Sequence, residues 1–294
     1  MEDIRALLDK YPGTVALGEI SSEDSLKTMA EYTQGDKRLH MGYSFDLLTD
    51  DFKASYIKQV VESLEARVSD GWPCWSVSNH DVIRVASRWG RTQNAEGNAT
   101  LAKMLYAMIS SLRGSVCSYQ GEELGLVEAE IAYEDLQDPY GITFWPQFKG
   151  RDGCRTPHPW ESQKDNAGFS TAKPWLPVPE AHYTTAVDTQ EHDENSVLNS
   201  YRHFSAWRKG FEAILYGDIE FIETPEPILA FKRSYNGQTL LVCFNLSNEA
   251  QTISLEQLGV SELSLITDHK LVTATINDNN LEMPAFASVY AKLS

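Results

Sequence analysis

Apolar residues recur along roughly the first 120 residues in two alternating patterns. Segments in which they return every three or four residues predict helices, and the clearest is residues 57–68, where Ile57, Val61 and Leu64 fall on one face. Short apolar or β-branched runs predict strands. The predicted helices cover 1–10, 22–34, 57–68 and 98–112, and the predicted strands run to Glu19 and over 38–45, 72–81 and 115–119. Strand and helix thus alternate as in parallel βαβ units.

Four such units are half of an eight-fold (β/α) barrel, which typically needs about 250 residues. The following stretch, residues 126–195, is rich in Pro, Gly, Trp and Asp and has no clear period. A loop of this length inside a folded domain is usually functional. Residues 196–214 return to helical spacing.

The last part of the chain changes to a period of two after Gly217. Asn236-Gly237 is a strong hairpin turn. Strands are predicted over 228–233, 239–244, 252–255 and 288–291. We therefore expect two domains: residues 1–216, a partial barrel with a long loop after its last strand, and residues 217–294, a small antiparallel β-sandwich.

Composition narrows the class of partner. The apolar content of 42% and the charged content of 23% are ordinary for a globular protein. The net charge of −17 argues against nucleic acid and anionic membranes as partners, because like charges repel. A neutral ligand neither needs nor opposes such a field.

The chain has no run of about 18 apolar residues, so no membrane span is expected. Its acidic start is unlike a secretory signal, and we expect a cytoplasmic protein. The cysteines lack the spacing of a metal site, which favours buried free thiols: Cys74, Cys117, Cys154 and Cys243.

Two predicted strands end on acids, at Glu19 and Asp81. Glycoside hydrolysis uses one carboxyl that donates a proton to the leaving oxygen and one ionised carboxylate that attacks or stabilises the transition state. With one βα unit between them, the two acids are expected on non-adjacent strands that face one pocket. The alternative is that Glu19 merely begins a helix and Asp81 caps one.

Gly18-Glu19-Ile20 and Asn79-His80-Asp81 resemble two signature segments of the α-amylase superfamily (glycoside hydrolase family 13). Gly150 to Pro157 resembles the Arg-Asp-x-x-Arg-Thr-Pro segment of its bacterial α-glucosidases, and Tyr119 to Gly125 also matches the family. The resemblance implies strands five to eight of a (β/α)8 TIM barrel, a C-terminal antiparallel β domain, and retaining hydrolysis of α-glucosidic bonds in short oligosaccharides or α-glucosides. For this chain we expect no cofactor and no metal.

The resemblance also implies roles for single residues. Glu19 would be the general acid and base, and Asp81 the transition-state stabiliser. His80 would bond sugar hydroxyls, and Arg151 would bond the substrate or the third carboxylate. Arg155 is assigned to a loop-pinning salt bridge. Trp145, Trp160 and Trp175 are expected either to stack on sugar faces or to staple the loop.

The family's Arg-x-Asp nucleophile segment belongs ahead of Met1, so the chain resembles a C-terminal fragment that is inactive alone. We expect it to pair with an N-terminal half or to self-associate. Three alternatives share its residues: a transglucosylase of the same family, a catalytically silent carbohydrate-binding or scaffold protein, and an inverting hydrolase that uses Glu19 and Asp81 with water.

Overall fold

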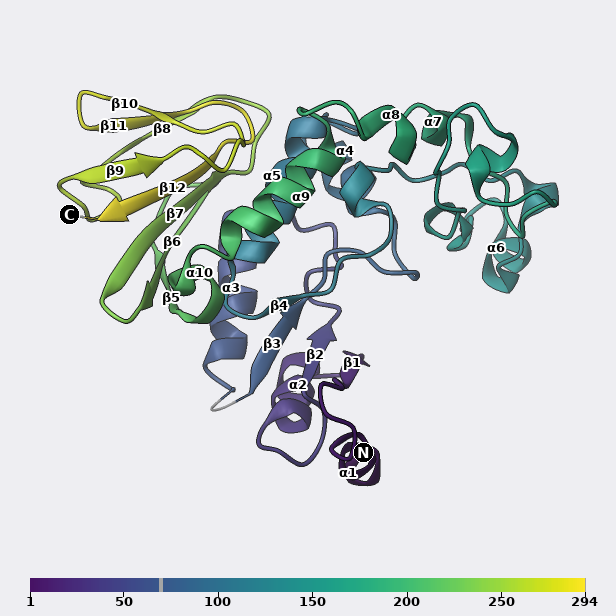
Figure 1. The fold of residues 1–294 in the computed structure, drawn as a ribbon, viewed down its shortest axis with the longest axis horizontal. Helices are drawn as coiled ribbons and strands as arrows, with labels where there is room; N and C mark the ends of the chain where they lie inside the picture. The colour runs from purple at the N-terminus through teal and green to yellow at the C-terminus, as the bar shows by residue number, and fades with distance from the viewer. Residues whose placement is uncertain (69–70, 294) are drawn as a thin grey trace.

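The computed structural model describes residues 1–68 and 71–293, and a parallel sheet forms its N-terminal part (Figure 1). The four strands run in the order β1-β2-β3-β4, and every neighbouring pair is parallel. They are β1 (Leu17–Ile20), β2 (Met41–Ser44), β3 (Trp72–Trp75) and β4 (Ser115–Val116). The helices are α1 (Glu2–Leu8), α2 (Ser25–Thr33), α3 (Ala54–Glu65), α4 (Val85–Thr92) and α5 (Ala99–Ser111). The predicted alternation is confirmed, with α4 as an unpredicted addition.

Helix α3 shows why the sequence folds in this way. Its buried side chains include Ile57, Val61 and Leu64, the face that the helical spacing predicts. Its first N–H groups have no partner within the helix. The carboxylate of Glu226, from the C-terminal part of the chain, accepts hydrogen bonds from the backbone N–H groups of Ala54 and Ser55 at 3.0 and 2.8 Å.

The C-terminal part contains two antiparallel sheets. The five-stranded sheet has the order β5-β6-β7-β12-β9, and the three-stranded sheet has the order β10-β11-β8. Asn236 and Gly237 have φ angles of 49° and 78° in the turn between β6 and β7, as the Asn-Gly pair predicts. The strands are β5 (Asp218–Ile222), β6 (Ile228–Tyr235), β7 (Gln238–Asn245), β8 (Gln251–Ser254), β9 (Leu263–Ile266), β10 (Thr275–Asn277), β11 (Asn280–Met283) and β12 (Ser288–Leu293).

Two helices connect the long loop to these sheets. The sequence predicts one helix over 196–214, but the structure has α9 (Val197–Arg208) and α10 (Glu212–Tyr216). The backbone turns at Gly210, whose N–H bonds to the carbonyl of Trp207. The expected continuous helix is therefore wrong at this point, because the chain redirects before it enters β5.

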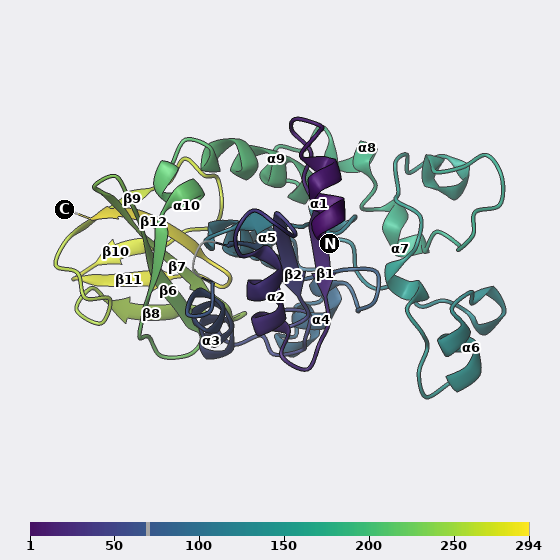
Figure 2. The same ribbon diagram turned by 90° about the horizontal axis from the view of Figure 1, so that it is seen from below.

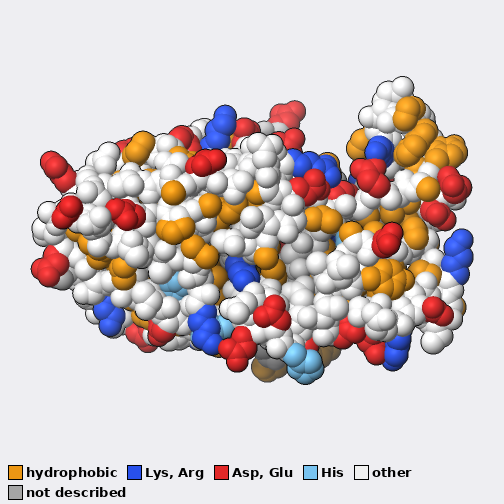
Figure 3. All heavy atoms as spheres, turned by 90° about the horizontal axis from the view of Figure 1, so that it is seen from above, with side chains coloured by type: hydrophobic (Ala, Val, Ile, Leu, Met, Phe, Trp, Pro, Cys, Tyr) orange, Lys and Arg blue, Asp and Glu red, His pale blue; other side chains and the backbone are white. Residues whose placement is uncertain are grey.

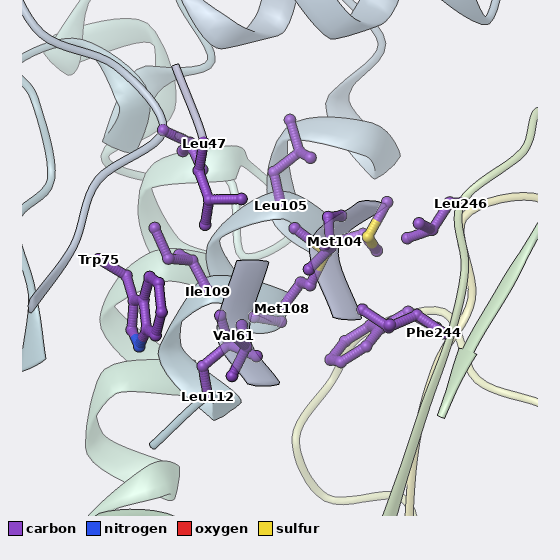
Figure 4. Packing of buried hydrophobic residues seen from close by; sticks show 14 of the residues in the cluster. Leu47, Val61, Trp75, Met104, Leu105, Met108, Ile109, Leu112, Phe244 and Leu246 are labelled. Atoms are coloured by element: carbon purple, nitrogen blue, oxygen red, sulfur yellow. The ribbon is translucent and has the colours of Figure 1, made fainter. Parts of the chain in front are cut away.

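One hydrophobic core joins the helices to the five-stranded sheet (Figure 4). Val61 of α3 and Met104 and Met108 of α5 belong to the same buried cluster as Phe244 of β7. Inside this contact the hydroxyl groups of Ser111 and Tyr290 lie 2.7 Å apart. A second cluster, which includes Ile253 and Leu281, fills the space between the two antiparallel sheets.

The loop of residues 126–195 projects as an arm from the sheet's carboxyl edge, and the same arm stands out at one end of the space-filling view (Figures 1, 2 and 3). A small cluster of its own, Ala129, Ile131, Leu136 and Leu176, packs against Trp145. Trp145 therefore packs within the loop and helps to hold it together, which is one of the two roles expected for it. Between β4 and α9 the chain forms short helices: η1 (Glu122–Leu124), η2 (Tyr133–Asp135), α6 (Pro139–Phe144), η3 (Asp152–Cys154), η4 (Asp165–Gly168), α7 (Glu180–Tyr183) and α8 (Val187–Gln190).

The four cysteines are free thiols, and all but the half-buried Cys117 are buried, as predicted. Within the described ranges, no helix has both the length and the apolar character needed to cross a bilayer. The two outer strands of the parallel sheet, β1 and β4, each have one neighbour only among the described residues. Several apolar side chains on and before β1 are exposed: Ile4, Leu7, Val15 and Leu17.

We predict that the two parts unfold together. Phe244→Ala should lower the free energy of unfolding by about 3–5 kcal/mol, because it empties a fully buried site in the shared cluster. All seven tryptophans precede residue 208, and only Trp207 among them contacts the C-terminal part in the described contacts, through Asp268 and Tyr290, so tryptophan fluorescence reports mainly the unfolding of the N-terminal part. The fluorescence transition in urea should therefore move with a substitution made in the β-sheet.

Ile276→Ala, on the exposed side of β10, is the control and should change the free energy by less than about 0.5 kcal/mol. A fluorescence transition that stays in place for Phe244→Ala would show that the two parts unfold independently.

Candidate functional site

The structure brings the predicted acids to one place at the carboxyl ends of the strands. Glu19 lies in β1, and His80 and Asp81 follow β3, with β2 between the two strands. One ligand atom from each of Glu19, His80 and Asp81 lies within 4.8 Å of the other two. Glu19 begins no helix, and α4 starts after Arg84, so neither acid is explained as a helix-end residue.

Tyr43 contacts Glu19 from the neighbouring strand. The two residues are register partners between β1 and β2, and the Tyr43 hydroxyl donates a hydrogen bond to Oε2 of Glu19. Burial and the adjacent Glu19 raise the pKa of Tyr43 above its usual range, so the phenol stays a neutral donor. Sequence reasoning missed Tyr43, since only the register between the strands identifies it.

Asp81 is held at one carboxylate oxygen by two arginines of the long loop. Its Oδ1 accepts from Nη1 of Arg151 at 2.9 Å and from Nη2 of Arg155 at 3.0 Å. Nε2 of His80 lies 3.5 Å from the same oxygen. The Asp81 backbone N–H donates to Oδ1 of Asn79 at 2.9 Å, which fixes the turn after β3.

Arg155 does pin the loop, as the sequence predicts, but its ion-pair partner is the candidate acid itself. Its Nε also donates to the backbone carbonyl of His80 at 2.7 Å. The segment Arg151 to Arg155 is therefore bonded to both residues of the His80-Asp81 pair. Sequence reasoning gave this arginine a structural role only, because its partner lies 74 positions away in the chain.

Arg151 is itself held by a buried acid that the sequence did not single out. Asp138 accepts from Nε of Arg151 at 2.8 Å and from Nη2 at 3.1 Å. This pairing holds the pKa of Asp138 at about 2 and raises the pKa of Arg151 above its usual range. Asp138 therefore stays ionised, and Arg151 stays charged, at any physiological pH.

Further contacts tie the arm to the exit of β4. Nε2 of His158 lies 2.7 Å from Oε1 of Glu123, and the buried Arg84 joins the two segments by donating from Nη1 to the Gln120 carbonyl at 2.7 Å and from Nη2 to Oγ1 of Thr156 at 3.3 Å. Trp160 is half exposed, with its ring centroid 4.6 Å from that of His158. Trp175 is also exposed, and for these two tryptophans a sugar contact stays a prediction.

A metal ion is one conceivable occupant of the Glu19, His80 and Asp81 cluster, since imidazole and carboxylate groups are common ligands. The two guanidinium groups on Asp81 oppose it, because they place two positive charges beside the expected cation. A neutral polyhydroxyl ligand meets no such repulsion. Its vicinal hydroxyls suit a mixed set of carboxylates, imidazole and guanidinium donors.

Two families match the chain. The one described as "Alpha amylase, catalytic domain" matches residues 1–217, and the one described as "Alpha-amylase SusG C-terminal domain" matches residues 228–289. The Probable alpha-glucosidase of Rhizobium meliloti (strain 1021) is 43% identical over 296 residues, which cover 100% of this chain and 52% of that protein. The Oligo-1,6-glucosidase of Heyndrickxia coagulans is 28% identical over 86% of this chain and 51% of its own length.

Among solved structures, the alpha-glucosyl transfer enzyme XgtA superposes with a TM-score of 0.93 at 51% identity, covering 100% of this chain and 53% of that one. The trehalulose synthase MutB from Pseudomonas mesoacidophila superposes with a TM-score of 0.81 at 22% identity, covering 100% of this chain and 58% of that one, which shows a shared fold. The chain thus spans about half the length of the relatives it matches.

The Asp138–Arg151 pair predicts how the free energy of unfolding changes in acid. An acid whose pKa is lowered by folding stabilises the protein above its unfolded pKa near 4, and that stabilisation disappears as the pH falls towards 2. Between pH 4 and pH 2 the free energy of unfolding of the unchanged protein should fall by on the order of 2 kcal/mol more than that of Asp138→Asn. Urea unfolding at each pH measures the difference.

Asp188→Asn is the matched control, since Asp188 lies in the same arm and accepts its hydrogen bonds from Ser162, which carries no charge. It should keep the acid dependence of the unchanged protein. Equal slopes for the unchanged protein and Asp138→Asn would contradict the assignment.

Proposed function

The chain belongs to the α-amylase catalytic-domain family, and from that premise we propose that it carries the acid–base side of an α-glucosidase site. The observation that supports this is the convergence of Glu19, His80, Asp81 and Arg151 at one edge of the parallel sheet. The proposed reaction is retaining hydrolysis of α-glucosidic bonds in short oligosaccharides or α-glucosides.

In this proposal Glu19 acts first as an acid and then as a base. As an enzyme carboxylate bonds to the sugar's anomeric carbon, the glycosidic bond breaks and its oxygen takes the proton of Glu19. Glu19 then removes a proton from water, whose oxygen attacks the same carbon and releases the attacking carboxylate. The family resemblance assigns that attacking carboxylate to a segment ahead of residue 1.

Asp81 and Arg151 have the complementary task. The ring gains positive charge in the oxocarbenium-like transition state, and a nearby carboxylate stabilises it. The contacts of Asp81 with Arg151, Arg155 and His80 all fall on Oδ1. We infer that Oδ2 faces the sugar, and that His80 and Arg151 bond its hydroxyls.

Transfer of the glucosyl group to another sugar is a second candidate. It is favoured by the 51% identity to XgtA, which is described as a glucosyl transfer enzyme. The chemistry differs only in the second step, where Glu19 would deprotonate an acceptor hydroxyl instead of water. A silent carbohydrate-binding protein remains as the outcome in which sugar binds and no bond is cleaved.

We further propose that the open sheet is completed by a complementary half barrel. Strands β1 and β4 each expose one edge, and parallel sheets are normally covered on both faces. A groove of about 500 Å³ runs beside the β4 edge, with Trp72, Ser115, Ser118, Tyr201 and Arg208 among its lining residues. Such a half would supply the attacking carboxylate. A cytoplasmic location stays a prediction.

Activity should depend on this completion. The chain alone should release no glucose from maltose above the blank, and co-expression with the part of the Rhizobium meliloti relative that it does not cover should restore release. In the restored complex Glu19→Gln should reduce the rate about 10²–10⁴-fold, because proton transfer is lost. Glu23→Gln, an exposed neighbour, is the control and should keep the rate.

The products separate the alternatives. Release of α-glucose supports retention, β-glucose supports an inverting pair, and trisaccharide formation supports transfer. Maltose binding without cleavage in the complex supports the silent protein. Brisk glucose release by the chain alone would overturn the assignment of the attacking carboxylate to another segment.

Self-association should accompany the open edges when the chain is alone. At micromolar concentration, light scattering after size exclusion should show dimers or larger species. Leu17→Lys should reduce them, because a lysine on an open edge disfavours strand pairing. Ile276→Lys, on β10, should leave them unchanged. A stable monomer of the unchanged chain would contradict the prediction.

A further inference from the structure

Asp138 lies at the N-terminal end of α6, and its side chain is fully buried. Its two oxygens accept four N–H groups. Three come from Arg151, namely the backbone N–H at 2.8 Å, Nε at 2.8 Å and Nη2 at 3.1 Å. The fourth is the backbone N–H of Tyr140 at 3.2 Å. The acid therefore fixes both the backbone and the side chain of Arg151.

A guanidinium group is planar and offers its N–H groups in fixed directions. With Nε and Nη2 directed at Asp138, only Nη1 is directed at Asp81, at 2.9 Å. Arg151 therefore bonds Asp81 with one N–H group. An arginine without another anionic partner commonly grips a carboxylate with two parallel N–H groups, and it would then cover both oxygens.

The close approach of α6 to Arg151 depends on two glycines. A Cβ on Gly141 would lie 2.6 Å from the carbonyl oxygen of Lys149, and a Cβ on Gly150 would lie 2.9 Å from Cα of Gly141. Gly150 also has φ at +79°, which favours glycine. No other residue fits at this crossing without moving Asp138 away from Arg151.

A second buried acid holds Asp138 in turn. Oδ2 of Asp152 accepts from the backbone N–H groups of Gln137 and Asp138 at 2.7 and 2.8 Å. The segment 137–138 is thus bonded to the residue that follows Arg151. The link from the arm to the strand end is continuous: Asp152, Asp138, Arg151 and then Asp81.

We propose that Asp138 is a positioning residue that divides the guanidinium fork of Arg151, so that one oxygen of Asp81 stays open to a sugar hydroxyl. The inference rests on the proposed sugar site, but the geometric part stands apart from it. Removing the charge of Asp138 should let Arg151 turn both of its outer nitrogens onto Asp81. The sugar then loses a partner although every residue that touches it is still present.

The test uses the full chain, uniformly labelled with ¹⁵N. The Arg151 Nε–H signal, assigned by its loss in Arg151→Lys, should shift strongly or disappear in Asp138→Asn, because Nε loses its charged acceptor and the amide offers one oxygen where the carboxylate offers two. It should change little in Asp81→Asn, which leaves Nε on Asp138. Asp188→Asn in the same arm should leave the signal in place. An unchanged signal in Asp138→Asn would overturn the proposal.

Maltose titration of the same samples supplies the functional readout. Asp138→Asn should weaken the affinity about tenfold or more, as expected for a misplaced binding group. Asp138→Glu, which keeps the charge, should recover part of it. Equal affinity of Asp138→Asn and the unchanged chain, with a loss in Arg151→Lys, would also overturn the proposal. If maltose binds to none of the samples, the proposed sugar site of this chain fails, while the Nε–H signals still decide the Asp138–Arg151 link.

Should Asp138→Asn fail to fold, Gly141→Ala offers a second route to the same test. It keeps both charges but pushes α6 away from the Lys149 carbonyl. It should produce the same change in the Arg151 signal, and a normal signal in a folded Gly141→Ala protein would count against the proposal.

Discussion

The packing of α3 and α5 against the five-stranded sheet is the contact on which the rest of the structure depends. An open parallel sheet of four strands leaves its outer helices without the ring that normally surrounds them. Here Val61 of α3, Met104 of α5 and Phe244 of β7 pack in one buried hydrophobic cluster. The Glu226 carboxylate also accepts a hydrogen bond at the N-terminal end of α3. This packing holds the two helices in place, and the helices hold the parallel strands. The carboxyl ends of those strands carry Glu19 and Asp81.

The charge arrangement at those strand ends differs from that of the whole molecule. The chain carries a net charge of −17, yet two arginines and a histidine surround the one oxygen of Asp81. Positive groups are thus concentrated around one carboxylate, and their hydrogen bonds fix its orientation. On the other side, Glu19 meets the neutral hydroxyl of Tyr43 in its register pair. The two acids therefore lie in different surroundings, one beside a phenol and the other beside guanidinium groups.

Much of this was predictable from the sequence, and the reasons are local. Glu19 and Asp81 each end an apolar run, and the carboxyl ends of parallel strands meet at one edge, so their proximity follows from the pattern. Helix α4 was not predicted, because residues 85–90 are all buried, including the polar Ser87 and Arg88, so polarity along the sequence does not mark an exposed face. Among them the buried guanidinium of Arg88 donates hydrogen bonds to backbone carbonyls such as those of Val77 and Ile83. Contacts between distant segments could not be predicted either. Tyr43 reaches Glu19 only because of the register between β1 and β2. Asp138 reaches Arg151 where two glycine-containing segments cross, and no periodicity in the sequence marks that crossing.

The arm is fastened to the strand ends mainly by ionic hydrogen bonds, whereas the helices are fastened by apolar burial. These two kinds of attachment respond differently to the surroundings. Apolar burial weakens on cooling, and partly exposed ion pairs weaken as dissolved salt screens them. Lower temperature should therefore weaken the attachment of the helices to the sheet, whereas added salt should weaken the attachment of the arm to Asp81.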